Sequence, residues 1–125
     1  MLNHKDAVAT IAVKDLATAR KFYAGTLGLK QVDSEDEEVI VFQSGKSLIN
    51  VYRSRFAGTN KATALTWGVG AEFDDVVREL KSKGVTFEHY DMPGVDRQGD
   101  VHVAGPMKVA WFKDPDGNIL NVINQ

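Results

Sequence analysis

The sequence predicts an α+β protein in which many short strands accompany two helices, and three observations support this class. Short segments rich in β-branched and aromatic residues, bounded by Gly, Pro and Asp, recur along the 125 residues. Apolar residues at helical spacings of three and four occur in two segments. The order strand, helix, three strands occurs twice, and the matching positions of Asp15 and Glu72 set a period of about 57 residues.

The first half begins with a predicted strand over residues 7–13. Asp15 is a suitable N-cap for the helix that follows, and Gly28 is suited to end it. The apolar stripe of this helix consists of Leu16, Ala19, Phe22, Tyr23 and Leu27. The three later strands are predicted over 29–33, 39–43 and 47–53, with a Ser44–Gly45 turn, before a polar, Gly-containing connection over 56–62.

The second half repeats this order with one further strand after its helix, and it begins with a predicted strand over 64–69. The next helix has an acidic first turn and lysines in its last turn, which suits the helix dipole, and Gly84 ends it. Its apolar stripe consists of Phe73, Val76, Val77 and Leu80. The remaining strands are predicted over 85–88, 101–103, 108–112 and 118–123.

The last two of these strands are joined by a tight turn, Asp114-Pro115-Asp116-Gly117. Pro115 sets φ for the second position of the turn, and Asp114 can accept hydrogen bonds from the amides that follow it. Gly117 can adopt the positive φ that returns the chain. The sequence therefore predicts a closing hairpin.

This hairpin, from Phe112 to Leu120, resembles that of the vicinal oxygen chelate superfamily, which includes glyoxalase I, ring-cleaving dioxygenases, fosfomycin-resistance enzymes and bleomycin-binding proteins. The opening residues 12–16, with Lys21-Phe22-Tyr23 and Leu27-Gly28 after them, are similar to the superfamily's first module. The resemblance implies a single domain over 1–125 with two βαβββ modules, at about 7–55 and 63–125. It also implies curved mixed sheets around a cleft, helices on the outside, and a homodimer.

Composition excludes several classes of protein. A net charge of −2 gives no electrostatic reason to expect nucleic acid or an anionic membrane as a partner. The absence of cysteine excludes disulfides and thiolate metal sites. The polar N-terminus lacks the apolar segment of a signal peptide, and no apolar run approaches the ~20 residues of a membrane helix, so we expect a cytoplasmic protein.

The resemblance also identifies four positions at which the metal-dependent members carry their ligands. These positions hold Val8, Leu65, Asn121 and Ile49, or Asn50 in place of Ile49 if the register slips by one residue. Aliphatic side chains cannot ligate a metal, and an amide is a weak ligand for a divalent ion. A catalytic metal normally has about three protein ligands, so we expect no divalent metal and no other cofactor, unless one strand is shifted.

The three histidines offer no ligand set with a recognisable spacing. His4 lies four residues before Val8, and His89 and His102 accompany later strands. We expect surface or hydrogen-bonded roles for all three, although a coincidental pairing of His89 with His102 stays open.

Alternation along the strands predicts the residues that line the cleft. Apart from the four positions above, these are Thr10, Trp67, Val109 and Trp111, with Ala12, Ile119 and Ile123 beside them; Asn50 and Tyr52 join only in the slipped register. The resemblance places Val109 and Trp111 toward the cleft. Such a cleft suits a flat aromatic molecule, but both tryptophans can equally be core residues.

Residues 91–100 form a long polar segment where the first half has a short connection. It is either a binding loop, with Tyr90, Met92, Arg97 and His102 in reach of a ligand, or a solvated surface loop. No nucleophile with a paired base is visible.

The predicted function is metal-independent binding of a small, aromatic or apolar molecule, for resistance or sequestration. The alternative is a glyoxalase- or dioxygenase-like enzyme whose metal is held by other residues, or a metal-free acid–base catalyst. A third possibility is an interaction module with an empty cleft.

Overall fold

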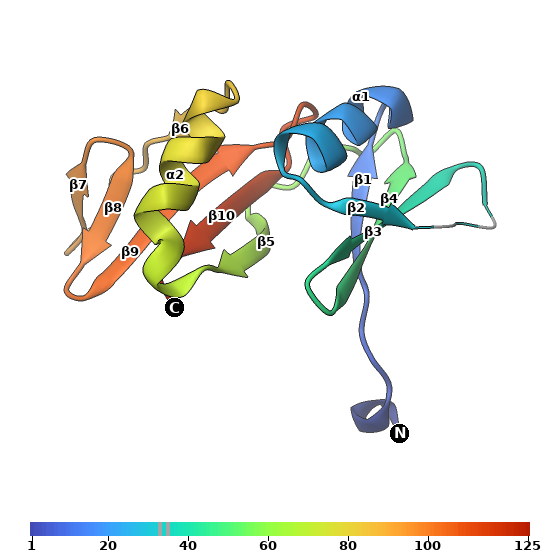
Figure 1. Ribbon diagram of the computed structural model, residues 1–125, viewed down its shortest axis with the longest axis horizontal. Coiled ribbons are helices and arrows are strands. Elements are labelled where there is room, and N and C mark those ends of the chain that lie inside the picture. The colour runs from blue at the N-terminus through green and yellow to red at the C-terminus, as the bar shows by residue number, and fades with distance from the viewer. Residues whose placement is uncertain (33, 35) are drawn as a thin grey trace. The chain divides into compact units, whose positions relative to one another are not determined.

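The computed structural model describes residues 1–125 with the exception of 33 and 35. The chain forms two compact units, Met1–Thr59 and Asn60–Gln125, which are described in turn (Figure 1). The mixed α+β class predicted from the sequence is confirmed: each unit contains one sheet and one α-helix.

Unit 1 contains a mixed four-stranded sheet with the strand order β1-β4-β3-β2. Strand β1 is parallel to β4, and the other pairs are antiparallel. Its elements are η1 (Leu2–His4), β1 (Ala9–Val13), α1 (Leu16–Arg20), η2 (Lys21–Thr26), β2 (Lys30–Val32), β3 (Val39–Ser44) and β4 (Ser47–Arg53). Of the predicted strand over 29–33, Asp33 lies outside the described residues.

The helical segment of unit 1 begins and ends as its sequence predicts. The Asp15 carboxylate caps it by accepting hydrogen bonds from the Ala17 amide at 2.9 Å and the Thr18 hydroxyl at 3.1 Å. Gly28 ends it with a φ of 75°. The second part, η2, is π-helical rather than α-helical, which the apolar spacing did not reveal.

The core of unit 1 lies between this helical segment and one face of the sheet. The Tyr23 ring lies 5.8 Å from the Phe42 ring, centroid to centroid, so η2 covers the face that holds Phe42. Cross-strand pairing gives that face its other buried members: Ile11, Val13, Ile40, Ile49 and Val51. The opposite face carries Thr10, Val41 and Asn50, which are direct neighbours on three adjacent strands.

Unit 2 contains a six-stranded sheet with the order β5-β10-β9-β8-β7. Strand β6 also pairs with β9, beside the segment that β8 occupies. The elements are β5 (Thr63–Gly68), η3 (Gly70–Glu72), α2 (Phe73–Ser82), β6 (Phe87–Glu88), β7 (Asp96–Gln98), β8 (Val101–Ala104), β9 (Met107–Lys113) and β10 (Ile119–Ile123).

Helix α2 lies across one face of this sheet (Figure 1). An ion pair of 3.6 Å between Asp74 of α2 and Lys108 of β9 identifies that face, because Lys108 shares it with Ala110 and Phe112. The helix-covered face holds the core of the unit: Phe87, Ala110, Phe112, Leu120 and Val122. We call the opposite side the open face of unit 2.

The predicted closing hairpin is present between β9 and β10. The Asp114 carboxylate, 4% exposed, accepts hydrogen bonds from the amides of Asp116 and Asn118 at 3.0 and 2.9 Å. It also accepts one from the Asn118 side chain at 2.7 Å, and Gly117 has a φ of 92°. The hydrogen bonds of Asp114 and the positive φ of Gly117 therefore fix the turn, as its sequence predicts.

The sequence suggested a loop over residues 91–100, but part of this segment is a strand. Residues 96–98 form β7, which makes an antiparallel hairpin with β8 through a turn at Gly99, whose φ is 63°. All three residues of β7 are exposed, so no alternation of polar and apolar residues marked the strand.

Candidate ligand-binding site

The open face of unit 2 carries three of the residues predicted to bind a ligand. Trp111 of β9 and Asn121 of β10 are directly opposite each other in the antiparallel ladder, and Val109 lies two residues from Trp111 on the same face. Asn121 is 7% exposed. All three side chains therefore belong to the same face of the sheet.

Three rings gather on this face. The Trp111 ring lies edge to face with His102 at 4.8 Å between centroids and with Tyr90 at 5.4 Å. The Tyr90 and His102 rings are 6.1 Å apart. We call Tyr90, His102 and Trp111 the aromatic cluster. Strands β8 and β6 both pair with the same edge of β9, through His102 with Val109 and Glu88 with Trp111. This pairing brings the three rings of the aromatic cluster together.

His102 is held in one orientation by the backbone. Its Nε2 atom accepts a hydrogen bond of 2.9 Å from the Tyr90 amide, so the proton of the neutral ring is on Nδ1. The residue is 1% exposed, and Nδ1 has no hydrogen-bond partner among the described residues. His102 therefore presents a buried donor that is free to pair.

Two further buried polar atoms on this face lack partners among the described residues: the Tyr90 hydroxyl and Asn121 Oδ1. Burial, with a smaller contribution from the Glu88 carboxylate, raises the pKa of Tyr90 above its ordinary value. The phenol therefore stays protonated at neutral pH and keeps its donor. A buried polar group without a partner costs about 1–3 kcal/mol, so such groups are expected at places where a ligand or water supplies the missing bond.

A cavity of about 220 Å³ opens beside the aromatic cluster. The Trp111 indole is oriented toward one of its walls by a hydrogen bond of 3.0 Å from Nε1 to the Thr63 hydroxyl. The lining residues are Lys61, Ala62, Thr63, Tyr90, Trp111 and Ile119. Two aromatic rings, an aliphatic side chain and a few polar groups form a suitable site for one small planar molecule.

Three of the predicted site residues lie on the helix-covered faces of their units. Leu65 and Trp67 pair with Leu120 and Val122, so both belong to the helix-covered side, and Thr66 is the β5 residue beside Asn121. In unit 1, buried Ile49 shares the helix-covered face. The strand pairing matches the slipped register, because Asn50 is the neighbour of Thr10.

The other predicted residues of unit 1 are more exposed. Val8 precedes β1 and is 41% exposed, and the exposed Thr10 places its hydroxyl 3.5 Å from the Val8 carbonyl. With Asn50 and Tyr52 they form the face away from the helix.

The remaining histidines lie outside the aromatic cluster. His4 contacts the Asn3 side chain in η1. His89 lies 2.8 Å from Asp100, whose second oxygen accepts from Lys81 at 3.1 Å. These two hydrogen bonds hold the pKa of the Asp100 carboxyl below its ordinary value. This arrangement joins α2 to the β7–β8 turn.

The donor set does not fit a divalent metal. Taken unit by unit, the face of unit 1 away from the helix presents Thr10 and Asn50, and the open face of unit 2 presents Thr66 and Asn121. All four are neutral oxygen donors. No group of three His, Cys, Asp or Glu side chains in the described part of the chain is arranged to hold a metal ion. Neutral amides and hydroxyls do not offset the loss of water from such an ion.

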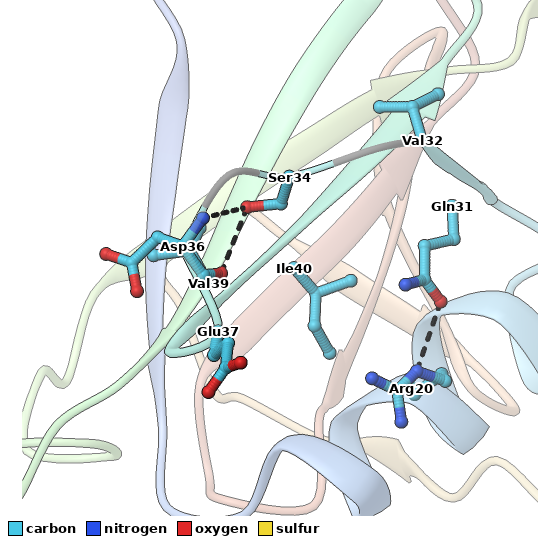
Figure 2. A pocket seen from close by; sticks show the side chains of 8 residues that line it. All are labelled: Arg20, Gln31, Val32, Ser34, Asp36, Glu37, Val39 and Ile40. Carbon is cyan, nitrogen blue, oxygen red and sulfur yellow. Dashed lines mark hydrogen bonds between the residues drawn. The ribbon is translucent and has the colours of Figure 1, made fainter.

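A second cavity, about 420 Å³, lies in unit 1 (Figure 2). It is larger than the cavity of unit 2, but no aromatic side chain lines it, and Arg20 donates a hydrogen bond of 3.1 Å to Gln31 at its wall. Its other lining residues are Val32, Ser34, Asp36, Glu37, Val39 and Ile40. We assign the ligand site to unit 2, where ring surfaces and unpartnered polar atoms occur together.

Sequence comparison identifies the family. The model of the glyoxalase/bleomycin resistance protein/dioxygenase superfamily matches residues 5–122, nearly the whole chain. The chain belongs to this superfamily. The resemblance seen in the closing hairpin is therefore confirmed, and this superfamily includes both metalloenzymes and resistance proteins.

Solved structures of the glyoxalase/bleomycin resistance protein/dioxygenase superfamily share the fold at low identity. The fosfomycin resistance protein FosX from Listeria monocytogenes is 15% identical with a TM-score of 0.69, over 100% of this chain and 93% of that chain. Lactoylglutathione lyase from Agrobacterium tumefaciens is 16% identical with a TM-score of 0.70, over 98% and 95%. A superfamily protein from Alicyclobacillus acidocaldarius is 20% identical with a TM-score of 0.69, over 98% and 93%.

Among the described residues, no helix has both the length and the apolar character that crossing a membrane requires.

The sequence missed Lys61 and Thr63, which line the cavity. Lys61 precedes β5 within the predicted connection over 56–62, and Thr63 is the first residue of β5, just before the strand predicted from residue 64. No pattern in the sequence pointed to either residue. Tyr90 and His102 were recognised as candidates within reach of a ligand, but their contact with Trp111 depends on the pairing of β6 and β8 with β9.

Proposed function

We propose that this protein binds a small planar organic molecule in the cavity of unit 2 without a metal ion, as a resistance- or sequestration-type member of its superfamily. The observation that carries the proposal is the cavity walled by Trp111 and Tyr90, whose lining also includes the polar groups of Lys61 and Thr63 and the Tyr90 hydroxyl, which lacks a partner among the described residues. Stacking on the rings supplies affinity, and the polar atoms orient the ligand.

The size of the cavity limits the ligand. A volume of about 220 Å³ lies below the roughly 300–1,000 Å³ typical of sites for drug-sized ligands. A molecule with one ring and a short substituent is therefore the expected occupant.

The two tryptophans provide the test, because they lie on opposite faces of the same sheet. Trp67→Phe leaves Trp111 as the single emitter, and Trp111→Phe leaves Trp67. A panel of planar one-ring compounds is titrated against both variants while tryptophan emission is recorded.

A ligand in the proposed cavity changes the emission of Trp67→Phe with a saturable dependence on concentration and leaves that of Trp111→Phe nearly unchanged. Equal changes in both variants, or none in either, would remove the support for the proposal. Calorimetry with Trp111→Ala adds a second measure, since affinity is expected to fall more than stability.

The metal-independent part of the proposal is tested separately. Elemental analysis of the purified protein is expected to give far less than one transition-metal ion per chain, and binding is expected to survive a chelator. A stoichiometric metal that the chelator removes together with binding or turnover would favour a metalloenzyme of the glyoxalase or dioxygenase type.

We also propose that the two units form one domain over 1–125 and that the protein is a homodimer, as the sequence resemblance implies. Light scattering of the eluting peak during size-exclusion chromatography is expected to give twice the mass of the 13.7 kDa chain.

A further inference from the structure

The polar groups that line the cavity of unit 2 are donors. The Thr63 hydroxyl oxygen already accepts the Trp111 Nε1–H at 3.0 Å, so its own proton is free to donate. The Tyr90 hydroxyl has no partner among the described residues. Lys61 forms no hydrogen bond or ion pair with the described part of the chain, so its charge is not compensated there.

The acids nearest to this lining along the sheet are engaged elsewhere. Glu88, the cross-strand neighbour of Trp111, forms an ion pair of 3.1 Å with Lys113. The Asp114 carboxylate accepts three hydrogen bonds within the closing turn. Neither is a cavity-lining residue, so no carboxylate of the lining competes with a bound anion.

We infer that the ligand of this site is an aromatic monoanion, such as an aryl or arylvinyl carboxylate, rather than a neutral or cationic aromatic compound. This inference rests on the proposed function and specifies its ligand class. The ring lies against Trp111 and Tyr90, and the carboxylate accepts hydrogen bonds from Lys61 and the Thr63 and Tyr90 hydroxyls. Donors pair more strongly with an ionised oxygen than with a neutral one.

A matched series of ligands tests the inference. Cinnamate, cinnamyl alcohol and cinnamylamine share a ring and spacer and carry a negative, a neutral and a positive group at pH 7.5. Calorimetry is expected to give a Kd for cinnamate at least roughly tenfold below that of the alcohol, with the amine weakest. Raising NaCl from about 20 to about 300 mM should weaken cinnamate binding and leave alcohol binding unchanged.

Variants then test the donors. Lys61→Gln is expected to weaken cinnamate binding roughly three- to fivefold and to leave cinnamyl alcohol unaffected, while Lys61→Arg restores most of the loss. Lys46→Gln, at an exposed turn of unit 1, is the matched control and should change neither Kd. Melting temperatures of all three variants establish that each is folded.

The outcomes separate the inference from the function on which it rests. If the alcohol or amine binds as tightly as cinnamate and changes Trp111 emission, the ligand class is wrong and the proposed function stands. A preference for cinnamate that Lys61→Gln leaves intact overturns the role given to Lys61. If neither this series nor the larger panel changes Trp111 emission, both proposals fail.

Discussion

The Tyr90 hydroxyl allows a binding role to be distinguished from a structural one. It is buried and has no hydrogen-bond partner among the described residues, although the ring packs edge to face on Trp111 at 5.4 Å. Tyr90→Phe keeps the ring and this contact and deletes one oxygen. In most proteins, removing a buried tyrosine hydroxyl breaks a hydrogen bond and lowers stability. Here there is no such bond to lose.

The expected magnitude follows from the desolvation of the hydroxyl. An unpaired buried hydroxyl costs about 1–3 kcal/mol, and the small void left by the missing oxygen removes part of the gain. We therefore expect Tyr90→Phe to raise the free energy of unfolding of the ligand-free protein by about 1 kcal/mol. For a chain of this length that corresponds to an increase in melting temperature of roughly 3–5 °C.

Ligand binding should respond in the opposite direction. The variant loses one donor to the bound molecule, so its affinity for cinnamate is expected to fall by roughly five- to tenfold while the ring contacts remain. Denaturant unfolding, a melting curve and calorimetry on the same preparation give the three quantities.

Tyr23→Phe provides the matched control for Tyr90→Phe. The Tyr23 side chain is fully buried in unit 1 and has an interaction partner there. Its variant is therefore expected to show no gain in stability and no change in affinity. A Tyr90→Phe protein that is less stable than the parent by 1 kcal/mol or more would refute the reasoning, because the hydroxyl would then be satisfied within the folded chain.

Three further substitutions test the fold around the site. Asp100→Asn should lower the melting temperature at pH 7, because the hydrogen bond from His89 holds the pKa of the carboxyl below its ordinary value. The difference should shrink as the pH falls below the ordinary value of 3.8 and vanish once the pH lies below the lowered pKa of the folded protein, where the carboxyl is protonated in both states. Gly68→Ala should destabilise unit 2 by about 1–3 kcal/mol in denaturant unfolding, because its Cβ would lie 2.7 Å from the Gln125 backbone oxygen. Gly25→Ala, in the helical segment of unit 1, should instead stabilise by about 0.5–1 kcal/mol, because nothing described beyond its chain neighbours and its own helix backbone lies within 4 Å of the added carbon. A loss of stability at this position would contradict the open space around it.

The sequence predicted the repeated order of elements and the closing hairpin because each depends on local chemistry. The carboxylate of Asp15 caps α1, and that of Asp114 binds the amides of its own turn. Such signals act within a few residues, so no knowledge of the partner strands is needed. Residues 96–98 were not predicted as a strand because the strand that they form is exposed on both sides.

The open-face residues of β5 differ by one position from those predicted, and the reason lies in the helix connections. Thr10 lies five residues before the N-cap Asp15, whereas Thr66 lies six residues before the N-cap Glu72. The 3₁₀ turn η3 precedes α2, so the two caps are not at the same distance from their strands. In a strand, a one-residue error moves every side chain to the other face, which is why Trp67 was predicted to line a cleft and instead lies beside Val122.

The unpartnered atoms of unit 2 also bear on how this site is related to the metal positions of its superfamily. The sequence resemblance implies that Asn121 stands where metal-dependent members carry a carboxylate, and its Oδ1 is buried without a partner among the described residues. An apolar side chain of similar size, such as leucine, would remove this cost to stability, as phenylalanine would at position 90. Selection for stability alone favours those replacements, so the presence of both polar groups supports the proposed binding role, in which a ligand supplies the missing bonds. Asn121→Leu is therefore expected to combine a higher melting temperature with weaker binding, and a variant that lost stability without losing affinity would show that the amide supports the fold instead.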